Sequence, residues 1–238
     1  MRKSMILFLV CCLLLCAISF TSCGGSKELF NFEQKKDDTL IITAFYKKND
    51  LKYTSVEIPA TYMNKTVTEI GAQVFEGNAT MTSIILPDSI TVIGDSAFAN
   101  CSHLTEINLP EGLTTIGEWA FYNCSNITSL TLPLSVDSIG TNAFNGMASL
   151  TSYTGSMKHM PMIAADTLTE VTLIATEEDY LSPAVFHLCK NMTKLTYTAT
   201  KSEWEAMKKA EGWLSSYPRD RLVVHCTDGD IIYEKNME

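Results

Sequence analysis

The sequence contains few basic residues. Lysine and arginine number 18 against 27 aspartate and glutamate, so the formal net charge is −9 at pH 7. Because affinity for phosphate backbones and anionic headgroups is built mainly from Lys and Arg, this composition argues against a nucleic-acid-binding protein. Hydrophobic residues make up 46% of the chain, which is enough for a packed core and excludes a wholly disordered chain.

The sequence also lacks the common motifs of enzymes and metal sites. It has no CxxC pair, and none of its four histidines lies at metal-ligand spacing from a cysteine. We find no paired carboxylates, catalytic triad or phosphate-binding loop. We therefore expect a protein that is not an enzyme and that holds no cofactor and no metal, with histidines in surface or structural roles.

The first residues are typical of an export signal. Arg2 and Lys3 precede an apolar run over 5–20, which is short for a membrane span but suits the core of a signal peptide. The run ends at Phe20-Thr21-Ser22-Cys23, which resembles a bacterial lipobox. The resemblance implies that residues 1–22 are removed and that Cys23 carries a diacylglyceryl thioether and an acylated amine.

Two or more acyl chains would make release from a membrane very slow. We therefore expect an exported protein, anchored to the membrane through lipid on Cys23 in the outer membrane or on the cell surface. The mature chain would keep 16 basic against 27 acidic residues, a formal charge of −11. The alternative is an ordinary cleaved signal in which Cys23 plays no part.

Proline, glycine and phenylalanine recur at a fixed spacing of 23 residues, and such self-similarity is the signature of a stacked repeat. The recurring positions are Pro87, Pro110 and Pro133, then Gly71, Gly94, Gly117 and Gly140, and finally Phe75, Phe98, Phe121 and Phe144. A single coil of this size cannot cover its own apolar side chains, so we expect successive coils to stack and share one core.

Each position in the unit has an expected role. Leu104, Ile107 and Leu109 predict a short strand with one buried face, and Pro110 would close it because proline cannot extend a ladder. Glycine at position 94 and its equivalents suits a turn with positive φ. Cys101 and Cys124, one coil apart, are expected to be buried thiols and not a disulfide, since parallel stacking rarely offers disulfide geometry.

The pattern L-P-x-x-[ILV]-x-x-I-G-x-x-A-F-x-x-C-x-x-L-x-x-I, over roughly residues 56–197, resembles the BspA-like class of leucine-rich repeats. The resemblance implies an α/β-type repeat solenoid of mostly short parallel strands, with no active site in the repeats. It also implies an exported bacterial surface protein that serves adhesion or protein recognition.

We divide the chain into a signal peptide (1–22), a lipidated polar tether (23–38), a solenoid with an N-terminal cap (39–197) and a C-terminal cap (198–238). In the N-terminal cap, strands at 39–46 and 55–58 are expected to form a hairpin. The pattern becomes irregular after Tyr153, and we interpret this as two irregular coils without a domain break.

The C-terminal cap should contain a helix and a hairpin. Ser202 and Glu205 have the spacing of a capping box, which predicts a helix to about Ala210. The apolar runs 222–226 and 231–233 flank Asp228-Gly229, a strong hairpin signal.

The strand residues that should point outward form the candidate binding surface. They are Ser83, Ile85, Glu106, Asn108, Ser129, Thr131, Ser152 and Thr154. Such side chains can hydrogen-bond over a broad area, although they lack the aromatic and arginine anchors of binding hot spots. The partner would be an unknown protein or glycan.

Alternatives stay open at each of these points. The outward residues could simply be solvated, and the protein could be a structural envelope lipoprotein without a specific soluble ligand. Trp119 and Tyr122 form a second candidate patch if they point outward, or they are buried between coils.

Overall fold

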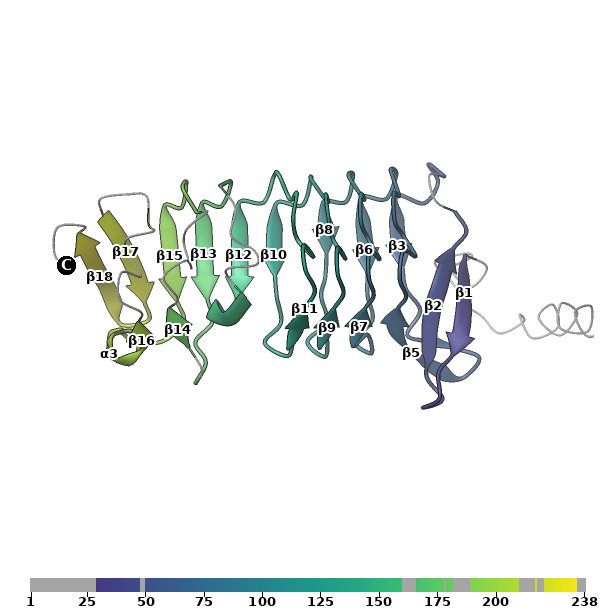
Figure 1. Cartoon of the computed structure of the whole chain (residues 1–238), viewed down its shortest axis with the longest axis horizontal. Helices are drawn as coiled ribbons and strands as arrows, with labels where there is room; N and C mark the ends of the chain where they lie inside the picture. The colour runs from purple at the N-terminus through teal and green to yellow at the C-terminus, as the bar shows by residue number, and fades with distance from the viewer. Residues whose placement is uncertain are drawn as a thin grey trace, which may run out of the picture.

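The structure is a computed structural model in which the chain winds into an elongated stack of coils (Figure 1). It describes residues 29–47, 50–159, 166–177, 179–181, 189–209, 217 and 221–234. The predicted signal peptide (1–22), Cys23 and residues 24–28 of the predicted tether lie outside these residues. The predicted repeat solenoid of short parallel strands is confirmed.

One side of the stack is formed by two sheets. The first consists of β3 (Ser55–Glu57), β6 (Ser83–Ile85) and β8 (Glu106–Ile107), all parallel. The second consists of β10 (Ser129–Thr131), β12 (Ser152–Gly155), β13 (Glu170–Leu173), β15 (Lys194–Tyr197), β17 (Arg221–Cys226) and β18 (Gly229–Glu234). Its strands are parallel up to β17, and β18 returns antiparallel.

A further sheet runs along another side of the coils. Its order is β1 (Phe30–Gln34), β2 (Leu40–Phe45), β5 (Lys65–Ile70), β7 (Val92–Ile93), β9 (Thr115–Ile116) and β11 (Ser138–Ile139), with β4 (Thr61–Tyr62) paired to β5. Each regular coil therefore has a second strand that the sequence did not predict. These strands are only two residues long, so they are too short to produce a visible alternation of apolar and polar residues.

The repeated phenylalanines form the centre of the core. The rings of Phe75, Phe98, Phe121 and Phe144 are stacked one coil above the next, with centroids 5.1, 5.2 and 5.5 Å apart and planes within 4° of parallel. Cys101 and Cys124 are buried beside them as predicted, and each Sγ donates a hydrogen bond to the carbonyl oxygen of a phenylalanine. The shared interior required by the repeat is thus present.

The repeated glycines do not have the positive φ that we expected. That conformation occurs instead two residues later, at Gln73, Ser96, Trp119 and Asn142, and six residues later, at Gly77, Asn100, Asn123 and Gly146. Gly117 is needed for a different reason, because a Cβ there would lie 2.5 Å from Asp95 Oδ1 of the preceding coil. The repeated glycine therefore allows neighbouring backbones to approach closely.

The predicted N-terminal hairpin is wrong in its partners. β2 pairs antiparallel with β1, whereas β3 pairs parallel with β6 and belongs to another sheet. The tether predicted for 23–38 is consequently too long, since Phe30–Gln34 is a strand. Phe30 and Phe45 both pack against Phe75 with ring centroids 6.2 and 5.1 Å away, so burial of aromatic surface explains why these residues join the fold.

The stack continues past the irregular segment after Tyr153. A 3-10 helix, η2 (Met157–His159), follows β12, and β12, β13 and β15 pair in parallel without interruption. The strands β14 (Tyr180–Leu181) and β16 (Lys208–Lys209) form a small parallel pair beside them. This continuity agrees with our interpretation of the segment as irregular coils of the same solenoid, without a domain break.

The C-terminal region contains the predicted helix and hairpin with shifted boundaries. α3 (Lys201–Ala206) has its capping box at Thr200 and Glu203, so the pairing predicted for Ser202 and Glu205 is wrong by two residues. The helix also ends before the predicted Ala210, because Met207 is extended and β16 begins directly after it. β17 and β18 form the predicted hairpin.

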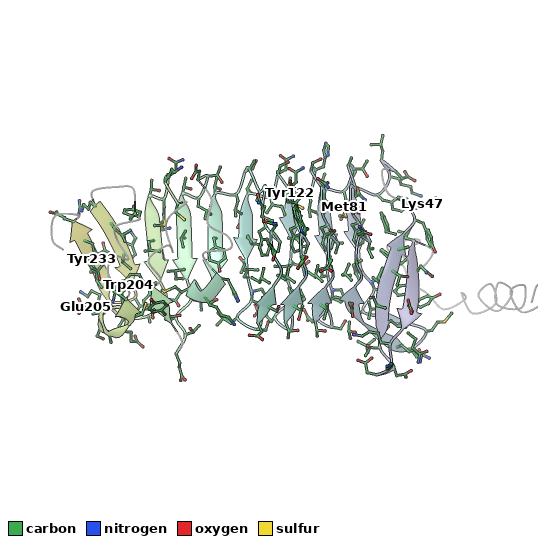
Figure 2. All side chains as sticks on the ribbon, viewed as in Figure 1. Lys47, Met81, Tyr122, Trp204, Glu205 and Tyr233 are labelled. Carbon is green, nitrogen blue, oxygen red and sulfur yellow. The ribbon has the colours of Figure 1, made fainter. Side chains whose placement is uncertain are left out.

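The helix and the hairpin pack against each other at this end of the stack. The fully buried Trp204 of α3 donates a hydrogen bond from Nε1 to the hydroxyl of Tyr233 on β18, at 2.9 Å (Figure 2). That the two terminal structures stabilise the stack stays a prediction.

Candidate functional site

The outward residues of the six-stranded sheet are aligned in two rows by its parallel register. The first row is Ser129, Ser152, Glu170 and Lys194, and the second is Thr131, Thr154, Thr172 and Thr196. The intervening residues Leu130, Tyr153, Val171 and Leu195 are buried. We refer to these two rows together as the hydroxyl face.

The hydroxyl face is longer than the predicted surface. Ser129, Thr131, Ser152 and Thr154 lie where the alternation placed them, but the prediction stopped before β13 and β15. Apolar and polar residues alternate in the segment 168–173, and this strand signal also indicates Glu170 and Thr172 as outward residues.

The predicted residues on β6 and β8 lie on the neighbouring three-stranded sheet. Ser83 and Glu106 are paired in register, and the side chain of Ile85 is 52% exposed. The side chain of Asn108 is not free to bind a partner as we expected. Its Oδ1 accepts a hydrogen bond from Leu86 N and its Nδ2 donates one to Leu86 O, each at 3.0 Å. This amide takes the place of a strand ladder and joins two coils.

A ladder of threonines positions the strands of both sheets. Their hydroxyls donate to the carbonyl oxygen of the threonine one coil earlier, at 3.0–3.2 Å, in the pairs Thr82 to Thr54, Thr105 to Thr82, Thr151 to Thr128, Thr169 to Thr151, and Thr193 to Thr169. These bonds fix the spacing between coils, so the adjacent outward residues keep a constant register.

The second row of the hydroxyl face differs from that ladder. Thr131, Thr154, Thr172 and Thr196 make no side-chain hydrogen bond within the part of the chain that the structure describes. A hydroxyl can both donate and accept, so this row presents four such groups in line to an external partner.

Charged groups lie only toward the C-terminal end of the hydroxyl face. Glu170 and Lys194 approach to 3.8 Å, and His225 Nδ1 lies 2.8 Å from Asp230 Oδ1. All four side chains are substantially exposed, and exposed pairs add little to stability. Glu170, Lys194 and Asp230 therefore give this end of the face local charge.

The described residues offer no evident catalytic or metal-binding constellation. Among them, no group of three or more His, Cys, Asp or Glu side chains is placed to hold a metal ion. Ser156 Oγ lies 3.1 Å from His159 Nδ1, but both residues are buried away from solvent. Burial also raises the pKa of the Cys124 thiol, the more so beside Cys101, which disfavours the nucleophilic thiolate.

Trp119 and Tyr122 form a separate aromatic pair on the turn that follows β9. Their ring centroids are 4.7 Å apart at an interplanar angle of 65°, and the Trp119 side chain is 40% exposed while Tyr122 is half-buried. The structure therefore supports an outward position for this pair and not burial between coils.

The lipid anchor expected on Cys23 stays a prediction. Cys23 lies outside the described residues. Within those residues, no helix combines the length and the apolar character that crossing a bilayer requires.

Comparison with known proteins identifies the repeat. The family model described as the BspA type leucine rich repeat region matches in six copies, over residues 39–164 and 68–193. The chain belongs to this family. No curated protein matches the sequence.

Several solved structures resemble this BspA-type chain. The pneumococcal vaccine antigen PcpA is 22% identical with a TM-score of 0.57, covering 83% of this chain and 46% of that one. A leucine rich cell surface protein from Faecalibacterium prausnitzii is 21% identical with a TM-score of 0.50, covering 74% and 40%. Both likenesses show the fold, and the chain spans less than half the length of either protein.

A leucine-rich repeat protein from Bacteroides capillosus is also similar. It is 32% identical with a TM-score of 0.47, covering 57% of this chain and 97% of that one.

Proposed function

We propose that this BspA-type protein is a binding or adhesion module of the bacterial cell envelope, without enzymatic activity, and that its hydroxyl face contacts a macromolecular partner. The observation that carries the proposal is the aligned row Thr131, Thr154, Thr172 and Thr196, whose hydroxyls make no bond within the described chain. Membership of the BspA-type family, and the cell-surface description of the similar F. prausnitzii protein, favour the same role.

The geometry of the face suits a broad and weakly anchored contact. Parallel strands lie about 4.8 Å apart, so four neighbouring hydroxyls present a regular series to a partner with repeated polar groups. The face lacks the aromatic and arginine anchors that dominate most interfaces, so binding here would have to come from many small contacts. The partner is therefore a protein or glycan with an extended polar surface.

We further propose that lipid on Cys23 holds the protein on the membrane. The fold begins at Leu29, whose carbonyl oxygen accepts a hydrogen bond from the Tyr46 amide at 2.9 Å. Six residues of chain reach about 20 Å at most, so the stack would stand close to the membrane by its β1–β2 end. Its hydroxyl face would extend away from the lipid along the stack.

Binding is tested with arrays of glycans and extracellular-matrix proteins, probed with the purified chain. We expect the double variant Thr154→Lys/Thr172→Lys to lose about tenfold or more in affinity for any ligand found, because two long side chains would cover the row. Glu111→Lys is the control, since it changes the net charge by the same amount in an exposed turn after Pro110. The assignment to this face would be refuted if both variants lost affinity equally, or if the double variant kept the affinity of the native chain.

Anchoring and orientation are tested in cells. Cys23→Ala should move the protein from the membrane fraction to the soluble fraction, and protease added to intact cells should digest the native protein. Survival under protease would instead favour a structural lipoprotein that faces the periplasm.

A further inference from the structure

Trp119 combines a left-handed backbone conformation with an exposed aromatic side chain. Trp119 has φ +58°, in the left-handed region that bulky side chains rarely adopt. The equivalent positions in the other coils hold Gln73, Ser96 and Asn142, so the repeat itself does not require an aromatic residue there. The turn takes this conformation in each regular coil, and what is particular to position 119 is a bulky aromatic residue that is 40% exposed. Because packing in the core does not require this residue, its presence in a conformation that bulky side chains rarely adopt calls for another reason.

The ring of Trp119 packs against Tyr122 and is partly exposed to solvent. It meets the half-buried ring of Tyr122 edge-on at 4.7 Å. The indole N–H makes no hydrogen bond within the described residues. A flat aromatic surface with an available donor at its edge is the usual platform for the C–H face of a pyranose ring.

Asparagine side chains lie on this turn and on the neighbouring turns. Asn123 Nδ2 donates to Asn100 Oδ1 at 3.1 Å, and Asn145 Nδ2 donates to Asn142 Oδ1 at 3.4 Å. Backbone bonds place these turns against each other, since Trp119 N donates to Thr141 O at 3.0 Å and Asn123 N to Asn145 O at 2.7 Å. All four asparagines are exposed, so their remaining amide groups are accessible to the hydroxyls of a ligand.

The charge of the stack restricts the kind of saccharide. No Lys or Arg occurs anywhere from Thr66 to Met157, whereas Asp95 and Glu118 are exposed on these turns. An acidic polysaccharide would find no lysine or arginine to pair with in these coils and would be repelled by the acidic side chains. A neutral polysaccharide carries no charge and would not be repelled. Arginine, which commonly anchors protein partners together with Trp and Tyr, is likewise missing from these coils.

We propose that Trp119 and Tyr122 form a subsite for a neutral saccharide, with Asn100, Asn123, Asn142 and Asn145 supplying hydrogen bonds. Trp119 and Tyr122 lie between β9 and β10 in sequence, and Figure 2 shows Tyr122 in the middle of the stack, away from both terminal hairpins. The subsite is separate from the hydroxyl face, so it goes beyond the proposed function and does not depend on it.

The test uses the full-length chain purified in detergent and an array of neutral and acidic oligosaccharides. Titration with the best neutral oligosaccharide should change the intrinsic tryptophan fluorescence. We expect Trp119→Asn to lose about tenfold or more in affinity and to lose the fluorescence response. Because asparagine tolerates positive φ and occupies the equivalent position 142, this variant should keep or raise the melting temperature.

Two control variants distinguish binding at this subsite from binding elsewhere on the stack. Gln73→Asn changes the equivalent position two coils earlier and should leave saccharide binding intact, as should Thr154→Lys/Thr172→Lys on the hydroxyl face. The proposal is overturned if no neutral saccharide binds, if Trp119→Asn binds as well as the native chain, or if Trp119 proves to be needed only for a protein ligand.

Discussion

At the scale of single residues, the repeated glycine shows how closely the coils are packed. A Cβ at Gly117 would lie 2.5 Å from Asp95 Oδ1 and 2.6 Å from Asp95 N, and one at Gly140 would lie 2.3 Å from Glu118 N. These distances are shorter than real Cβ contacts, so a larger residue would have to push two coils apart. The glycine is thus a requirement of stacking and not of the turn itself.

Gly117→Ala should therefore destabilise the protein although it adds only one methyl group. We expect its free energy of unfolding to fall by about 1–3 kcal/mol, as for other overpacked sites, measured by guanidinium denaturation. Gly112→Ala is the matched control, since its Cβ would meet only Asp88 O, at 3.3 Å. Equal stability of the two variants would contradict a close approach of the coils at Gly117.

His159 makes stability depend on pH. Burial, together with the charge of Lys158, lowers the pKa of this side chain below its ordinary value, and Asp137 opposes the shift only in part. The folded state then binds a proton less readily than the unfolded state does. The stabilisation is complete above the unfolded pKa near 6.5 and is lost as the pH falls below it.

His159→Asn should reduce this acid sensitivity, because asparagine can keep the bond made by Nδ1 to Ser156 without titrating. We expect the melting temperature of the native protein to fall more steeply between pH 7 and pH 5 than that of the variant. His103→Asn, at an exposed site, should leave the native slope unchanged. If the melting temperature of His159→Asn fell with pH as steeply as that of the native protein, groups other than His159 would cause the acid sensitivity.

At the scale of elements, the hairpin of β1 and β2 covers the apolar end of the stack. Phe45 is 4% exposed and packs on Phe75, whereas the next residue, Tyr46, is 63% exposed. The alternation of Phe30 and Phe32 with polar residues was a strand signal in the sequence, but the acidic and basic residues around it made the segment resemble a tether. Which strand pairs with β2 depends on contacts with a distant coil, so local sequence could not decide it.

Phe45→Ala should lower the free energy of unfolding by about 3–5 kcal/mol, the usual range for a buried phenylalanine. Tyr46→Ala should change it by about 0.5 kcal/mol or less, as is usual on the surface. Thermal and guanidinium unfolding of the two variants measure the difference. A small effect of Phe45→Ala would mean that the hairpin does not stabilise the first coil.

At the scale of the whole molecule, the repeat was predictable because identical residues at a 23-residue spacing must occupy equivalent places. The aligned rings from Phe75 to Phe144 and the pairing of Ser129 with Ser152 and of Thr131 with Thr154 follow from that rule. The features that could not be predicted were set by spatial neighbours. Examples are the two-residue strands β7, β9 and β11, the amide of Asn108 bonding Leu86, and the shifted cap at Thr200.

The regular coils and the irregular ones after Tyr153 form a single continuous stack, and the fold depends on this continuity. β12, β13 and β15 pair in parallel across the irregular segment, so opening one part should expose the core of the other. Cooperative unfolding of both parts together is therefore expected.

Hydrogen-exchange mass spectrometry in rising guanidinium tests this continuity most directly, because it reports the opening of each segment separately. Peptides containing β9 and β11 and peptides containing β13 and β15 should lose protection with the same free energy and the same dependence on denaturant. Loss of protection in β13 and β15 at a clearly lower guanidinium concentration, while β9 and β11 stay protected, would contradict the continuous stack.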